Sequence, residues 1–202
     1  GSRLRPHTLT VPKPLTVIAG KPIVQRLVED IASVIDEEIE EIAFVIGSSA
    51  KGFPSDTKEK LLNIADKLGA KGSVYIQHEA LGTAHAIYCA KESLSGPCVV
   101  AYAVTLFKAD FILDVHADGA IWVKEVENPS AFGVVKLENG IITDFIEKPN
   151  NFVSDLAIIG IYYFKSGEKL LEEIQYLIDN NLKENNEYQL TNVLESLRQQ
   201  GA

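Results

Sequence analysis

Short apolar runs alternate with amphipathic segments along the first half of the chain, and this alternation most constrains the fold. The apolar runs have the composition of strands buried on both faces of a sheet, and the amphipathic segments place apolar residues at helical spacing. Such alternation is typical of βαβ units, whose crossovers are right-handed and whose helices cover both sheet faces. The runs are residues 42–47, 72–77 and 97–103, and the amphipathic segments are residues 23–35, 58–68 and 84–93. The pattern predicts a three-layer, Rossmann-like α/β fold with a mixed, mainly parallel sheet.

The second half of the chain changes character. Asn139-Gly140 is a strong hairpin signal between two strand-like runs. We expect this half to add strands to the sheet formed by the first half and to carry two further helices. The expected strands are residues 120–126, 133–137, 141–147 and 158–164, and the expected helices are residues 167–180 and 188–200.

Composition bounds the class of protein. The 202 residues are 46% hydrophobic and 23% charged, which is the profile of a folded globular chain, and we expect a single domain. A formal net charge of -9 argues against a general nucleic-acid binder, which needs clustered cations. Cys89 and Cys98 are too few for a disulfide framework. No apolar run reaches the roughly 18 residues of a membrane span, and no signal segment is evident, so we expect a cytoplasmic protein with no membrane partner.

The opening stretch is basic and rich in proline. Pro12 and Pro14 restrict the backbone on both sides of Lys13, so that the cation is carried on a stiff segment. With Arg3 and Arg5 upstream, a suitable target is a polyanion such as a phosphate group. A disordered basic arm is the alternative.

Five motifs in order along the chain resemble those of the sugar-1-phosphate nucleotidyltransferases, in particular the thymidylyl and uridylyl enzymes that act on glucose 1-phosphate. Any one of these motifs alone would be a weak signal, but their common order spans nearly the whole chain. The motifs are GSRLRP with PKPL at residues 1–15, QHEALGTAHA at 77–86, AFGVV at 131–135, FIEKP at 145–149 and IGIY at 159–162.

The resemblance implies in-line attack of a sugar-phosphate oxygen on the α-phosphorus of a nucleoside triphosphate, with release of pyrophosphate. Arg3 and Lys13 would then be the catalytic cations that hold the triphosphate and stabilise the departing pyrophosphate. Gly1 would be the end of a glycine-rich turn that binds the nucleotide. For Lys13, a solvated loop residue is the alternative.

The resemblance assigns the base of the nucleotide to Gln77, Gly82 and Thr83. Gln77 offers both a donor and an acceptor, which suits the imide edge of uracil or thymine. Gly82 would let a base lie against bare backbone. As an alternative or in addition, Gly82 and Thr83 start the next helix, with Thr83 as its cap. His85 is interpreted as a packing or capping residue.

For the sugar 1-phosphate, the resemblance implies that Glu147 accepts hydrogen bonds from sugar hydroxyls and that Lys148 binds the phosphate. Gly133 would let a hydroxyl reach the main chain, and Tyr162 lies on the strand that faces the Glu-Lys-Pro motif. The alternatives are a surface ion pair for Glu147 and Lys148 and a bulge for Gly133.

The sequence departs from the family pattern at the metal. The family's magnesium aspartate is replaced by Val104, whose isopropyl group offers no ligand. We do not expect Asp110 and Asp114 to substitute. A second metal carboxylate would lie beyond Ala202, and a first central strand would precede Gly1, so we expect these residues to be part of a longer chain. The family's magnesium cofactor is therefore expected, but with ligands that are not intact in this chain.

These observations lead to one functional hypothesis and one alternative. We expect a nucleotidyltransferase domain with a nucleotide-binding half (residues 1–119) and a sugar-phosphate-binding half (residues 120–202). It would join dTTP or UTP to a hexose 1-phosphate, glucose more readily than mannose, but with impaired turnover because of Val104. The alternative is a non-catalytic module that binds nucleotide sugars or sugar phosphates; an unrelated α/β domain is a third, blander option. Formation of a homo-oligomer is left open.

Overall fold

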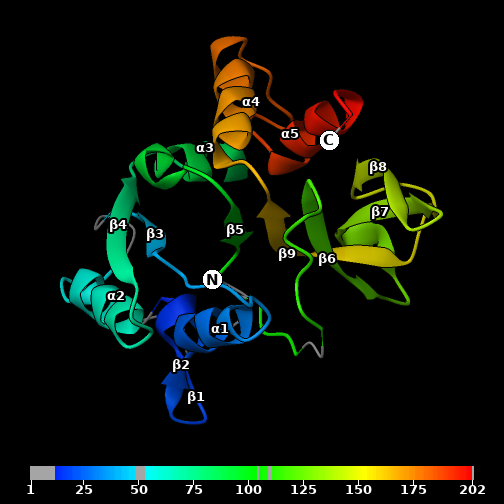
Figure 1. Cartoon of the computed structure of the whole chain (residues 1–202). Helices are drawn as coiled ribbons and strands as arrows, with labels where there is room; N and C mark the ends of the chain where they lie inside the picture. Colours follow the sequence, from blue (N-terminus) through cyan, green and yellow to red (C-terminus); the bar gives the residue numbers. More distant parts are fainter. Residues whose placement is uncertain (1–11, 49–52, 104, 109–110, 202) are drawn as a thin grey trace. The chain divides into compact units, whose positions relative to one another are not determined.

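The computed structural model describes residues 12–48, 53–103, 105–108 and 111–201. The chain forms two compact units, whose helices and strands are labelled in Figure 1. The first unit contains Gly1–Ala80 and Tyr102–Asp114, and the second contains Leu81–Ala101 and Val115–Ala202. Residues 81–101 are part of the second unit, and their expected role in nucleotide binding stays a prediction.

The first unit is built around a parallel pair of strands. Strands β3 (Glu41–Gly47) and β4 (Lys71–Gln77) align from Glu41 beside Lys71 to Gly47 beside Gln77. The helix between them, α2 (Thr57–Asp66), makes this a βαβ unit as the sequence predicts. The elements before it are a 3-10 turn η2 (Lys13–Leu15), a short hairpin β1 (Val17–Ile18) and β2 (Lys21–Pro22), and helix α1 (Ile23–Ala32).

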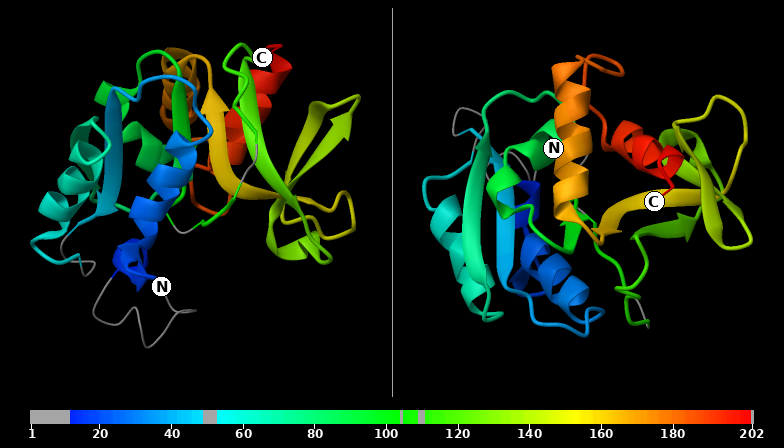
Figure 2. Two further views of the ribbon diagram at one scale, coloured as in Figure 1. Left: turned by 60° about the horizontal axis from the view of Figure 1, so that its bottom comes forward. Right: turned by 45° about the horizontal axis from the view of Figure 1, so that its top comes forward.

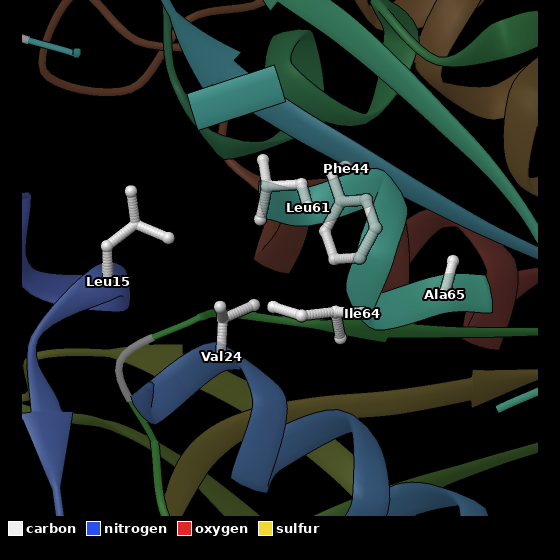
Figure 3. Close-up of a cluster of buried hydrophobic side chains, with 6 residues drawn as sticks. All are labelled: Leu15, Val24, Phe44, Leu61, Ile64 and Ala65. Carbon is white, nitrogen blue, oxygen red and sulfur yellow. The ribbon is translucent and has the colours of Figure 1, made fainter. Parts of the chain in front are cut away.

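The apolar faces of these elements share one core. Figure 3 shows Val24 of α1 facing Ile64 of α2, with Phe44 of β3 beside them. Burial of each large apolar side chain contributes about 1.5–3 kcal/mol relative to exposure. The cluster consists of Leu15, Val24, Phe44, Leu61, Ile64 and Ala65.

The second unit holds a five-stranded sheet and three helices. Strand β9 (Leu156–Phe164) is central: β6 (Gly119–Glu125) pairs with it, as do β5 (Cys98–Ala101) and β7 (Gly133–Glu138) (Figure 1). Strand β8 (Ile141–Glu147) pairs with β7 as the predicted hairpin partner, across Asn139 and Gly140, which both have positive φ. Helix α4 (Gly167–Asp179) lies between α3 (Thr83–Tyr88) and α5 (Leu190–Gln199) (Figure 2). Two 3-10 turns, η4 (Lys91–Ser93) and η5 (Pro129–Ala131), complete it.

The expectation of a mainly parallel sheet is wrong for the strands that the structure describes. Only β3 and β4 pair in parallel there, whereas every pair within the five-stranded sheet is antiparallel. An apolar run shows that a strand is buried on both faces, but it carries no information on strand direction. The run that starts β5 pairs with β9, a partner more than fifty residues later in the chain, and this pairing is antiparallel. The coarser prediction of a mixed α/β fold is confirmed.

In the described part of the chain, no helix has the length and apolar character that crossing a bilayer requires.

Cys98, the first residue of β5, gives a testable consequence of burial. Loss of hydration, and then the nearby Glu168 carboxylate, raise the pKa of the Cys98 thiol to about 11. At pH 8 we expect iodoacetamide to modify Cys98 about 100-fold more slowly in the native protein than in urea, because the reactive thiolate is scarce. Peptide mass spectrometry measures both rates, and equal rates would contradict the burial.

The raised pKa of the Cys98 thiol also predicts that stability is lost as the pH rises from about 9 toward 11.

Candidate functional site

Lys13 is carried on a turn that is pinned to the core of the first unit. The N–H of Leu15 donates to the carbonyl of Pro12 at 2.9 Å, and the N–H of Thr16 donates to the carbonyl of Lys13 at 3.1 Å. Leu15 is 8% exposed and belongs to the apolar cluster of Figure 3. The half-buried Lys13 is therefore held on ordered backbone, as the flanking prolines predict. Gly1 and Arg3 lie outside the described residues.

A hairpin that the sequence did not predict follows Lys13. Its turn consists of Ala19 and Gly20, both with positive φ, which matches the twist that a two-residue hairpin needs. The Arg26 guanidinium donates to the carbonyls of Ile18 at 2.8 Å and Ala19 at 2.6 Å. This cation, carried by α1, is thus engaged in holding the hairpin.

Lys21 and Glu29 form an ion pair beside this hairpin. The Lys21 Nζ atom lies 2.7 Å from a Glu29 carboxylate oxygen, and the Gln25 amide donates to the same carboxylate at 2.9 Å. The bond from Lys21, and then that from Gln25, hold the pKa of Glu29 below its usual value. Lys21 is therefore a structural cation of the first unit.

Gln77 ends strand β4 and is half-buried, opposite Gly47 at the end of β3. The carboxyl ends of both parallel strands therefore lie at the same edge of this two-stranded sheet. In open α/β folds, ligands bind outside the carboxyl ends of parallel strands. Gln77 thus has the position in its unit that a ligand-reading side chain needs.

Gly82, at the start of α3, lies in close contact with the main chain of Tyr188. A Cβ atom on Gly82 would lie 2.6 Å from the Tyr188 nitrogen, and the φ angle of Gly82 is 111°. Both features require glycine at this position. The Tyr188 main chain therefore covers the side of Gly82 where a Cβ atom would lie, and contact between Gly82 and a base stays a prediction.

The hydroxyl of Thr83 caps a different helix from the one we expected. Thr83 is the first residue of α3, which has no side-chain cap, and its Oγ1 atom accepts the N–H of Leu190 at 2.9 Å. Leu190 is the first residue of α5. The hydroxyl thus satisfies one of the unpaired donors at the start of α5. Thr83 is therefore a helix cap as expected, but for α5 rather than for α3.

Gly133, Glu147 and Lys148 lie together at the end of the β7–β8 hairpin. Gly133 pairs with Glu147 across the strands, and a Cβ atom on Gly133 would lie 2.9 Å from the Glu147 Oε2 atom. The other carboxylate oxygen of Glu147 lies 3.2 Å from Lys148 Nζ. The ion pair between Glu147 and Lys148, given above as an alternative to sugar binding, is present in the structure, and Gly133 lies beside it.

The backbone at Lys148 is held in an unusual conformation. Lys148 has a φ of 41°, which side chains without special support rarely adopt. Its N–H donates to the carbonyl of Phe132 at 3.1 Å, and the buried Pro149 follows. The Lys148 side chain remains 65% exposed, so its ammonium group can meet a ligand from solvent.

Glu147 also borders an open groove in the second unit, which the sequence did not indicate. The groove has a volume of approximately 490 Å³ and is lined by β8, α4, α5 and the loop between the two helices. Phe145, Tyr176 and Asn192 are among its lining residues. There is thus free space on one side of the Glu147 carboxylate.

Tyr162 does not join this arrangement. It is 3% exposed and lies in the middle of β9, where it pairs with Val100 of β5 and Ile121 of β6. Strand β9 meets β7 at Ala157, five residues earlier, a separation of roughly 16 Å along an extended strand. Its ring is stacked with that of Phe164 at a centroid distance of 6.5 Å. The structure therefore gives Tyr162 a place in the core.

The sequence profile of the family described as Nucleotidyl transferase matches residues 1–201. The chain belongs to the nucleotidyl transferase family. The motifs quoted from the sequence and the profile thus agree, and the family resemblance is confirmed.

Relatives from several organisms support this membership. The chain is 32% identical to the bifunctional protein GlmU of Methanococcus vannielii, over 98% of this chain and 45% of that protein. It is 36% identical to the mannose-1-phosphate guanylyltransferase catalytic subunit beta of Drosophila melanogaster, over 81% of this chain and 45% of that protein. The chain spans about half the length of the curated relatives it matches.

Solved structures share the fold at low sequence identity. A structure from Bacillus anthracis assigned as a glucose-1-phosphate thymidylyltransferase matches with a TM-score of 0.80 and 22% identity, over 99% of this chain and 79% of that one. A nucleoside-diphosphate-sugar pyrophosphorylase from Vibrio cholerae matches with a TM-score of 0.74 and 21% identity, over 96% and 82%. The α/β fold of the nucleotidyl transferases is therefore also the fold of this chain.

The metal site that the sequence resemblance implies falls largely on residues outside those that the structure describes. Between residues 12 and 201, outside the gaps given above, no three His, Cys, Asp or Glu side chains gather to hold a metal ion. Val104 and Asp110 lie outside the described residues. That Val104 leaves the magnesium ligands incomplete stays a prediction, and the proposed chemistry includes no step through the metal.

Proposed function

We propose that this nucleotidyl transferase binds a nucleoside triphosphate and a sugar 1-phosphate and joins them with release of pyrophosphate. The observation that carries the proposal is the grouping of Gly133, Glu147 and Lys148 at one hairpin end. A carboxylate, an exposed ammonium group and a position without a side chain are the three features that a phosphorylated sugar requires.

Each of these residues has a distinct role in the proposal. The Glu147 carboxylate accepts hydrogen bonds from sugar hydroxyls, with the strength typical of charged acceptors. Lys148 pairs with the sugar phosphate, and the 3.2 Å contact with Glu147 keeps its ammonium group near the hairpin end. Gly133 leaves room over the strand for the carboxylate and the sugar. Contact between Tyr162 and the sugar stays a prediction, and its burial favours a packing role.

For the nucleotide, we propose that Arg3 and Lys13 bind the triphosphate, with Gly1 at its phosphates, and that Gln77 and Gly82 bind the base. The ordered turn at Lys13 and the strand-end position of Gln77 support this assignment. The amide of Gln77 favours uracil or thymine. Relatives of this chain include a guanylyltransferase by name, so the base is a matter for direct assay.

The proposed reaction is a single displacement at phosphorus. A sugar-phosphate oxygen forms a bond to the α-phosphorus of the triphosphate, and the bond from that phosphorus to pyrophosphate breaks. Positive charge on Lys13 offsets the charge that develops on the departing pyrophosphate. We assign nucleotide binding to residues 1–119 and sugar-phosphate binding to residues 120–202.

Val104 favours a second candidate function, a module that binds these ligands without turnover. An apolar side chain where the family has a metal carboxylate removes a main source of charge neutralisation. Ligand binding by Lys13, Gln77, Glu147 and Lys148 does not depend on that carboxylate. Turnover, rather than binding, therefore distinguishes the two functions.

We expect the unaltered chain to bind its ligands and to release pyrophosphate slowly, and Val104→Asp to raise the rate by about 100-fold or more. A coupled pyrophosphate assay with magnesium tests UTP, dTTP and GTP against glucose 1-phosphate and mannose 1-phosphate. Rapid release by the unaltered chain would contradict the impairment. Ligand binding with no activity in either form would favour the binding module, and absence of binding by all five compounds would refute both functions.

A further inference from the structure

Two segments far apart in the sequence are joined by hydrogen bonds inside the second unit. The N–H of Tyr188 donates to the carbonyl of Leu81 at 2.7 Å, and the N–H of Ala84 donates to the carbonyl of Tyr188 at 3.0 Å. Two main-chain bonds thus enclose Gly82. We call residues 81–84 and 188–190, with the bonds between them, the clasp.

The side chain of Thr83 completes the clasp. Its Oγ1 atom accepts the N–H of Leu190 at 2.9 Å and lies 3.4 Å from the Gln189 Oε1 atom, to which its proton can be donated. The hydroxyl is therefore occupied on both its donor and its acceptor side by the start of α5. It therefore cannot at the same time donate its proton to a nucleotide.

On the other side of the clasp, Tyr188 is held by contacts within the loop between α4 and α5. The Tyr188 hydroxyl donates to the Asn181 side-chain oxygen at 3.0 Å, and Lys183 Nζ lies 4.9 Å from the centre of the Tyr188 ring. Asn181, Asn185 and Asn186 all have positive φ, which asparagine tolerates better than most residues. The loop between α4 and α5 thus has a defined backbone conformation that holds the Tyr188 main chain in place.

We propose that Thr83 is a positioning residue for the nucleotide: its hydroxyl, through Leu190, holds Gly82 at the end of the base-binding segment. This inference rests on the proposed function, because Gly82 is assigned to the base there. Since Gly82 is enclosed by the Tyr188 main chain, any loosening of the clasp changes where its peptide group lies. Thr83 thus acts on the nucleotide without touching it.

The sugar-phosphate residues are held by different bonds, so the two ligands can be separated by experiment. Gly133 and Glu147 are fixed by the pairing of β7 with β8, and Lys148 by the carbonyl of Phe132. None of these bonds involves the clasp. Loss of the Thr83 hydroxyl should therefore weaken one ligand and spare the other.

The test is a set of calorimetric titrations with UTP, dTTP and glucose 1-phosphate, well below the melting temperature. Thr83→Val removes the hydroxyl at nearly constant volume, and Thr83→Ser restores it. Thr57→Val is the matched control, because Thr57 is 1% exposed and its hydroxyl has no hydrogen-bond partner. Thr83→Ala replaces Thr83→Val if that variant does not fold.

For Thr83→Val we expect the Kd of the bound nucleotide to rise by about 5-fold, the effect of losing one hydrogen bond. We expect the Kd of glucose 1-phosphate to change less than about 2-fold. Thr83→Ser and Thr57→Val should retain nucleotide binding. A lower melting temperature with an unchanged nucleotide Kd, or equal weakening of both ligands, would overturn the positioning role alone. Absence of any nucleotide binding by the unaltered chain would overturn the proposed function and this inference with it.

Discussion

Replacement of Gly82 by alanine is expected to lower the free energy of unfolding by about 3 kcal/mol or more. A Cβ atom there would lie 2.6 Å from the nitrogen of Tyr188, which is main chain and cannot rotate away. Overpacking of this kind costs about 1–3 kcal/mol, and a φ of 111° adds a further penalty of roughly 1–2 kcal/mol for any side chain. Urea unfolding followed by circular dichroism measures the loss.

Gly69→Ala separates the two contributions to this loss. Gly69 has a φ of 76°, but a Cβ atom there would meet no atom within 4 Å. Its variant should therefore lose only the backbone term, about 1 kcal/mol. Equal losses at Gly82 and Gly69 would mean that the contact with Tyr188 does not constrain the fold.

The positions of strands and helices were largely evident in the sequence, because periodicity reports local burial directly. The hairpin across Asn139 and Gly140 is a clear case: both residues adopt the positive φ that this dipeptide favours. Helix α4 begins at its expected start, Gly167, and Ser166, whose hydroxyl accepts the N–H of Lys169, caps it. Local chemistry alone determines both features.

Features that depend on distant partners could not be predicted in this way. Strand β5 is antiparallel to its partner β9. The hydroxyl of Thr83 accepts the N–H of Leu190, which lies 107 residues later in the chain. No local pattern at either place encodes the partner. The hairpin at Ala19 and Gly20 was missed for a different reason, since alanine is a weak signal for a turn that needs positive φ.

Of the four residues that the sequence resemblance assigns to the sugar phosphate, three lie together in the structure and Tyr162 lies apart. Glu147 and Lys148 are adjacent in sequence, and Gly133 reaches them through one short hairpin. The turn alone would place Gly133 opposite Ile146, and a register shift between Lys136 and Leu137 brings Gly133 opposite Glu147 instead. Tyr162 lies on another strand, and its burial by β5 and β6 depends on a sheet order that the sequence does not contain.

Gly133→Ala should weaken ligand binding and leave stability nearly unchanged, whereas Gly82→Ala is expected to lower stability. The added Cβ atom would lie 2.9 Å from Glu147 Oε2 and 3.5 Å from the Cδ1 atom of Ile158. The closer atom is the end of a flexible side chain, so the carboxylate moves and the strand stays. We expect an unfolding free energy within about 0.5 kcal/mol of the unaltered chain. The Kd of glucose 1-phosphate should rise by about 10–100-fold, because hydrogen bonds to a displaced charged acceptor are lost.

A double-mutant cycle with Glu147→Ala tests whether Gly133 acts through the carboxylate. If it does, each single variant weakens glucose 1-phosphate binding, and the double variant binds no more weakly than Glu147→Ala alone. Calorimetric titration gives the four dissociation constants, and UTP or dTTP binding serves as the internal reference. Additive losses would show that Gly133 contacts the ligand directly. An unchanged Kd in Gly133→Ala would mean that the position of the Glu147 carboxylate does not matter for the sugar, and would contradict the proposed sugar-phosphate site.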